Sequence, residues 1–146
     1  MAFRLVKDPM DIQAEELPIS SQTVSVGELL ELDIDSTVWT TGDASTEHWQ
    51  RKGIAIEAAT SSDTEVKAIL INDYQQWEVD LDANSSASHN GDRMILNASG
   101  LTVNNTGTDS SAVGAVFLQR APVGVAADAT ALGWFIAGTG FDPDAS

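Results

Sequence analysis

The chain has 146 residues, 42% of them hydrophobic, which suits one well-buried domain and argues against disorder throughout. Its 22 acidic and seven basic residues give a net charge of -15, which would repel nucleic-acid phosphates and an anionic membrane surface. The absence of cysteine excludes disulfides and thiolate metal sites.

The N-terminal segment, residues 1–22, is predicted to be an extended arm with at most one turn of helix. Pro9 and Pro18 bracket the only stretch in it that could turn, "PMDIQAEELP". The segment lacks the apolar region of a secretory signal, so we expect the protein to begin as an intracellular product. We expect a β domain over residues 23–140 and a flexible tail over 141–146.

Seven short apolar segments then follow, each rich in Val, Ile, Leu, Trp or Phe and separated by Gly, Asn, Asp, Ser and Thr. This density of strand and turn signals is typical of all-β domains. We therefore predict an all-β fold, a single compact β-barrel or β-sandwich. The predicted strands lie within Val24–Ile34, Arg51–Ala58, Glu65–Ile71, Tyr74–Leu81, Arg93–Asn97, Ala112–Arg120 and Ala131–Ala137, and Asn104–Ser111 is predicted to be a loop.

The order of these segments suggests an internal repeat. "GELLELDIDSTVWTTG" begins at Gly27 and "GDRMILNASGLTVNNTG" begins at Gly91, and a second glycine pair, Gly53 and Gly114, has nearly the same separation. A duplication would give two three-stranded halves joined by the strand at Tyr74–Leu81. Identity between the halves is low, so the pattern fits chance convergence equally well.

Candidate ligands for a metal are few. His48 and His89 lie in polar loops without a partner at ligand spacing, so both are expected to be solvated. The run from Asp80 to Ser86 has oxygen-bearing residues at alternate positions, as a calcium loop does. Ser85 and Gly91, however, stand where such a loop needs Gly and Glu. We expect no metal and no cofactor.

No catalytic motif stands out either. No G-x-S-x-G occurs, and no acid and base flank any serine, so we expect a protein that is not an enzyme. An alternative is a small hydrolase whose residues meet only in the fold. Trp39, Trp49, Trp77 and Trp134 leave open a carbohydrate-binding or host-adhesion module, although core packing is the usual role of tryptophans in strands.

From Val24 to about Ala137 the chain resembles the capsid decoration proteins of tailed bacteriophages, also called cement or head-stabilising proteins. The segments that carry this resemblance are "VSVGELLELD", "QWEVD", "NGDRMIL", "LTVNNTGTDSS", "GAVFLQ" and "LGWFI". They consist of strands and turns and include no chemically specific group.

The resemblance implies a structural protein on the outer surface of an icosahedral head, at junctions between subunits of the major capsid protein, that stabilises the shell. It also implies a homotrimer or another small oligomer, and an N-terminal arm that orders on docking. The residues expected to contact the capsid are Phe3, Leu5, Val6, Met10 and Ile12. The loop that holds His48, Trp49 and Arg51 is expected to contact a neighbouring copy.

Overall fold

The computed structural model describes residues 3–32, 36–84, 86–97, 99–108, 116–123 and 130–141. They form two antiparallel sheets, one of them a half-barrel, and one 3-10 turn, η1 (Ala87–His89). The strands are β1 (Phe3–Lys7), β2 (Glu15–Pro18), β3 (Leu29–Leu32), β4 (Trp39–Thr41), β5 (Arg51–Ala55), β6 (Glu65–Leu70), β7 (Gln76–Asp80), β8 (Arg93–Leu96), β9 (Val103–Thr108), β10 (Phe117–Pro122) and β11 (Thr130–Phe135). The all-β prediction is confirmed.

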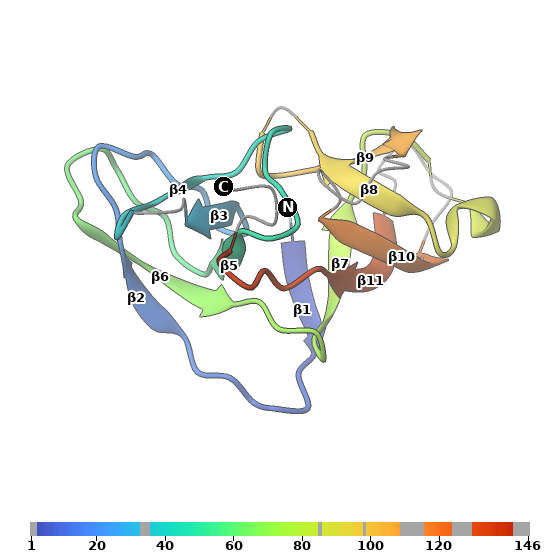
Figure 1. The fold of residues 1–146 in the computed structure, drawn as a ribbon, viewed down its shortest axis with the longest axis horizontal. Helices are drawn as coiled ribbons and strands as arrows, with labels where there is room; N and C mark the ends of the chain where they lie inside the picture. Colours follow the sequence, from blue (N-terminus) through green and yellow to red (C-terminus); the bar gives the residue numbers. More distant parts are fainter. Residues whose placement is uncertain are drawn as a thin grey trace.

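The two sheets share one topology. The five-stranded sheet has the order β2-β6-β5-β3-β4, and the six-stranded sheet has the order β1-β7-β11-β10-β8-β9. Without β1, the order of the second sheet is β7-β11-β10-β8-β9. It matches the order of the first sheet strand for strand, with β2 corresponding to β7, β3 to β8, β4 to β9, β5 to β10 and β6 to β11. We call β2–β6 the first half and β7–β11 the second half. In Figure 1 the halves lie side by side, with β1 between them.

Each half also has the same bridge between the ends of its sheet. In the first half Ile19, just after β2, forms a parallel bridge with Trp39 at the start of β4. In the second half Leu81, just after β7, forms a parallel bridge with Val103 at the start of β9. Both sheets are therefore rolled in the same way, and each encloses apolar side chains.

The repeat extends to single hydrogen bonds. Gly27 and Gly91 have φ values of 83° and 87°. Gly27 N donates to Ala55 O at 2.8 Å, and Gly91 N donates to Gln119 O at 2.9 Å, so the two donors have the same separation in sequence as the two acceptors. A positive φ costs glycine little, which explains why glycine precedes the second strand of each half, β3 and β8.

The predicted repeat is thus confirmed as a structural one, with two corrections. Each half has five strands instead of three, and the strand within Tyr74–Leu81 is the first strand of the second half and not a connection. Strand register also pairs Gly53 with Leu30 and, equivalently, Phe117 with Met94. Phe117 is therefore the counterpart of Gly53, whereas the proposed counterpart Gly114 lies outside the described residues.

The prediction of an extended N-terminal arm was wrong. Phe3–Lys7 is strand β1, paired antiparallel with β7, and Glu15–Pro18 is strand β2, paired with β6. Between them the Asp8 carboxylate accepts hydrogen bonds from Met10 N at 3.0 Å and Ile12 N at 3.1 Å, which makes a turn. The strands were missed because both of their partner strands lie far along the chain, outside the reach of local patterning.

Each of the seven predicted strand segments overlaps a strand, with residues 112–115 outside the described residues, but β4 and β9 were missed as well. Asn104, predicted to begin a loop, lies in β9, and Asn105 beside it is buried. The Asn105 side chain accepts from Ala83 N at 3.1 Å and donates to Ala83 O at 3.0 Å. These hydrogen bonds satisfy a buried amide, which explains how so polar a segment can form a strand.

Two clusters of buried side chains form the core. The smaller lies inside the first half and includes Leu17, Leu30 and Trp39. The larger fills the second half and extends to the outer face of the first half, where it takes in Leu29 and Ile54. The first half therefore has apolar side chains on both faces of its sheet, one face enclosed by its own strands and the other covered by the second half.

Candidate functional site

A groove of about 270 Å³ lies between the halves, along β1. Its walls combine strand β1 and Trp77 of the second half with the outer face of the first half. Almost all of the side chains that line it are apolar. The lining residues are Phe3, Arg4, Leu5, Val26, Gly27, Ile54, Ala55, Ile56, Ile69 and Trp77.

Strand β1 borders this groove with its outer edge, which is open except at Phe3. Among the described residues β1 is the end strand of its sheet, and β7 is its one strand partner. Beyond that pairing, Phe3 N donates to Gly27 O at 3.3 Å, so the backbone groups of alternate residues point away from β7. An edge strand beside an apolar groove can accept an extended segment of another chain, which adds backbone hydrogen bonds and buries side chains in the groove.

Exposed apolar side chains surround the groove. Val26 is 50% exposed and Ile56 is 43% exposed, and both line it, while Val6 on β1 is 52% exposed. Side chains of this kind gathered on one surface are typical of a site of contact with another protein. The arrangement offers a surface for binding.

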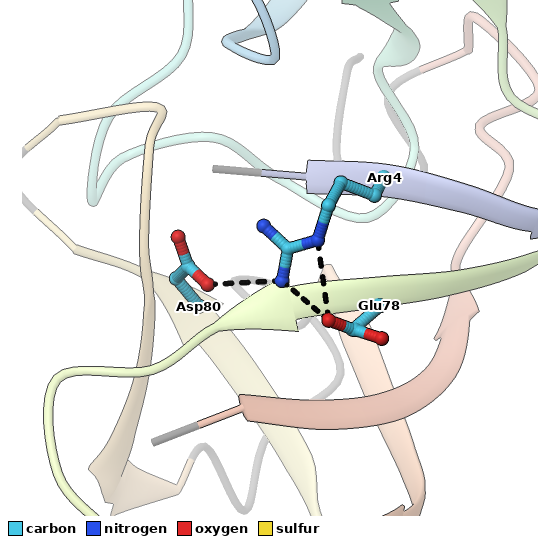
Figure 2. Close-up of polar contacts among 3 residues, drawn as sticks. All are labelled: Arg4, Glu78 and Asp80. Atoms are coloured by element: carbon cyan, nitrogen blue, oxygen red, sulfur yellow. Dashed lines mark hydrogen bonds and ion pairs between the residues drawn. The ribbon is translucent and has the colours of Figure 1, made fainter. Parts of the chain in front are cut away.

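An ion-pair network holds β1 in place (Figure 2). The Arg4 guanidinium donates to Glu78 Oε1 at 2.7 Å and to Asp80 Oδ1 at 3.1 Å. Burial lowers the pKa of Arg4, but the hydrogen bonds and charges of the two carboxylates outweigh this and raise the pKa above its ordinary value. The network therefore fixes the strand that forms one wall of the groove.

A second, smaller cavity, of about 90 Å³, surrounds Lys52. Lys52 is 2% exposed, and its ammonium group donates to His48 O at 3.0 Å, Gln50 O at 2.7 Å and Ile136 O at 2.9 Å. Three acceptors match the three protons of an ammonium group. The contacts join the first half to the segment after β11, which is a structural role.

Lys52 should make stability depend on pH. Burial lowers its pKa to about 7, against the opposing charge of Glu31, and the ordinary value is 10.5. Between these values the unfolded chain binds more protons than the folded one, so stability should rise with pH from about 7 to about 10. The wild type and Lys52→Met are compared by their melting temperatures across this range. As pH rises, the melting temperature of the wild type should increase relative to that of Lys52→Met. A difference between the two melting temperatures that stays constant would contradict the prediction.

The structure separates the five residues predicted to bind a capsid. Phe3 is 3% exposed and belongs to the core, so it is not a surface anchor. Leu5 is half-buried in the groove. The other three, Val6, Met10 and Ile12, are exposed on β1 and the turn after it.

The predicted contact residues between copies lie together in one loop and the strand after it. His48 is half-buried, Trp49 is 7% exposed, and Arg51 at the start of β5 is exposed. Gly140 N donates to Trp49 O at 2.8 Å, so the segment after β11 passes over this loop. Contact with another copy through these residues stays a prediction.

The described residues contain no group of three or more His, Asp or Glu side chains that could hold a metal ion. His89 Nδ1 accepts from Ser86 N at 3.3 Å, which is a local turn contact. In the candidate calcium loop, Asp80 binds Arg4, and Asp82 accepts from Asn105 N at 2.9 Å.

Trp39, Trp49 and Trp77 are buried, so these three rings do not form an exposed platform for a sugar.

The first-half wall of the groove was not identified from the sequence. Ile54 and Ile56 alternate with Ala55 in the segment "GIAIEA", so both faces of β5 carry apolar side chains. This pattern is typical of a strand covered on both sides and would have predicted a second layer. The same pattern could not have predicted that β1 lies opposite this wall and that a groove remains between them.

No protein-family model matches the chain, and no curated protein matches it at a significant level. No helix among the described residues is long and apolar enough to cross a membrane.

Proposed function

We propose that this protein is a virion component that binds the outside of an icosahedral phage head, at junctions between subunits of the major capsid protein, and stabilises the shell. The observation that carries the proposal is the apolar groove beside the open edge of β1. The resemblance of Val24–Ala137 to capsid decoration proteins gives the partner. The protein acts by binding, without a cofactor and without chemical turnover.

The physical mechanism is linkage. A protein that binds the assembled shell better than its separated subunits stabilises the shell by its binding free energy. Many copies act on one particle, so a modest affinity at each site suffices. The open edge supplies backbone hydrogen bonds, and the groove supplies apolar burial, with Arg4 holding β1 in register.

Placing a carboxylate in the groove should weaken attachment. Ile56→Asp puts an unpaired charge where the partner segment would be buried, and we expect binding to undecorated heads to weaken by at least about tenfold, or about 1.4 kcal/mol. Co-sedimentation with purified heads and the temperature at which the heads break open are the measurements. Deleting residues 1–22 is not a clean test, because it removes β1, β2 and the core residue Phe3.

Val123→Asp is the matched control. Val123 is 49% exposed, similar to Ile56 at 43%, but it follows β10 and does not line the groove. We expect this variant to bind heads as the wild type does. Equal binding by Ile56→Asp and the wild type would refute the groove as the capsid site, and failure of the wild type to bind any heads would refute the proposed function.

A further inference from the structure

The repeat identifies a second surface, on the outer face of the second half. In the first half Leu29, Ile54 and Ile69 are cross-strand neighbours in one row. The same register in the second half aligns Arg93, Leu118 and Trp134. The two rows occupy equivalent positions on equivalent sheets.

The two rows differ in what covers them. The first-half row is packed under the second half: Leu29 is 0% exposed, Ile54 is 2% exposed, and both belong to the core cluster that contains Trp77. In the second-half row Arg93 is exposed, and Leu118 and Trp134 are only half-buried. The face that the first half buries is therefore accessible on the second half.

A side chain in the same buried cluster as the first-half row indicates what would lie against the other row. Trp77, on β7, borders the same groove as Ile54, Ile56 and Ile69. Register makes Glu15, on β2, the counterpart of Trp77, because Trp77 pairs with Gly133 as Glu15 pairs with Ala68. Glu15 and its neighbour Glu16 are exposed.

The charges of these equivalent positions are complementary. Ile56 directly follows Ala55 as Arg120 directly follows Gln119, so the second-half face has Arg93 and Arg120 where the first-half face has the buried Leu29 and the 43% exposed Ile56. An apolar contact between Trp77 and the first-half row thus corresponds to an acidic-basic contact between Glu15 and the second-half row. Strand β2 and the strands of the second-half row lie on opposite sides of the molecule (Figure 1), so one chain cannot make this second contact with itself.

We propose that the occupant of this face is a second copy of the chain, packed head to tail. The first half of one copy, with Glu15 and Glu16, lies on Arg93, Leu118, Arg120 and Trp134 of the next copy. This contact repeats between molecules the packing that already joins the two halves within one molecule. Such a heterologous interface generates a closed ring when its rotation closes.

The contact forms through side chains and not by joining the sheets edge to edge. Pro18 lies at the exposed edge of β2 and has no N–H to donate, and two glutamates precede it on that edge. Proline and charge together discourage strand addition at a sheet edge. The acidic edge of β2, where Glu16 also forms an ion pair with Lys67 at 3.9 Å, can thereby meet the two arginines.

Charge reversal tests the interface on the isolated protein, by sedimentation velocity over a range of concentrations at physiological salt. We expect the wild type to associate, and Arg93→Glu/Arg120→Glu and Glu15→Lys/Glu16→Lys each to be monomeric, with association weakened about tenfold or more. An equimolar mixture of the two variants should associate, because each reversed face then meets a complementary one. All four side chains are exposed, and circular dichroism will show that the variants fold.

Matched controls reverse charges elsewhere. Asp11→Lys/Asp73→Lys changes the net charge by the same amount at exposed positions outside the face and should associate as the wild type does. The proposal is overturned by a monomeric wild type, by equal loss in this control, by loss in only one of the two test variants, or by a mixture that stays monomeric. Because no capsid is present, none of these results bears on the groove, which the Ile56→Asp experiment tests separately.

Discussion

Replacing Phe135 by alanine should destabilise the fold by about 3–5 kcal/mol, the usual cost of emptying a buried aromatic site. Phe135 is 1% exposed and makes edge-to-face contacts with Phe3, Trp77 and Phe117, at centroid distances of 5.1, 5.8 and 5.3 Å. Each such contact adds about 0.5–1.5 kcal/mol beyond the area it buries. The ring links β1, β7 and β10 to β11, so its loss weakens four strands together.

Leu70→Ala is the matched control for this prediction, because register makes Leu70 the first-half counterpart of Phe135. Leu70 is half-buried at the edge of its cluster, so we expect a loss below about 2 kcal/mol. Denaturant unfolding of both variants measures the difference. Equal losses would show that the aromatic cluster does not dominate the stability of the chain.

Gly133→Ala should cost about 3 kcal/mol or more, although it adds a single methyl group. A Cβ at Gly133 would lie 2.1 Å from Leu118 O and 2.5 Å from Phe117 Cζ. The backbone oxygen belongs to the neighbouring strand and cannot move without breaking the β10–β11 ladder. The first half shows the converse arrangement: Ala68 is the counterpart of Gly133, and Gly53 takes the place of Phe117.

Gly91→Ala is the control for added backbone strain. Gly91 has a φ of 87°, but nothing lies within 4 Å of a Cβ added there. We therefore expect a cost of only about 1–2 kcal/mol, that of a left-handed conformation for alanine. The midpoint and slope of denaturant unfolding separate the two variants, and a Gly133→Ala protein as stable as Gly91→Ala would contradict the overlap.

Local patterns predicted the strands whose two faces differ clearly or whose apolar run is continuous, such as β6, β7 and β11. They failed at Phe3–Lys7, where alternating apolar and basic residues could equally belong to a free arm. They failed again at Val103–Thr108, where three consecutive polar residues look like a loop. In both places a distant partner decides the structure: Arg4 binds carboxylates 74 and 76 residues away, and the Asn105 side chain binds backbone 22 residues away.

The candidate sites depended still more on the tertiary structure. The sequence correctly placed apolar residues near the N-terminus, but it could not distinguish Phe3, which lies in the core, from Val6, which is exposed. The Glu15 and Arg93 positions carried no local signal. Their correspondence with Trp77 and Leu29 appeared only when strand register aligned the two halves.

By itself, the sequence determined the all-β class, the acidic surface and the position of most strands, because alternation and turn residues act over a few neighbours along the chain. The tertiary structure alone decided that β1 joins β7, that a groove remains beside it, and that the outer face of one half is buried while its counterpart is accessible. Those outcomes depend on pairings between residues far apart in sequence, whose energies come from shared burial and hydrogen bonds that no local pattern encodes.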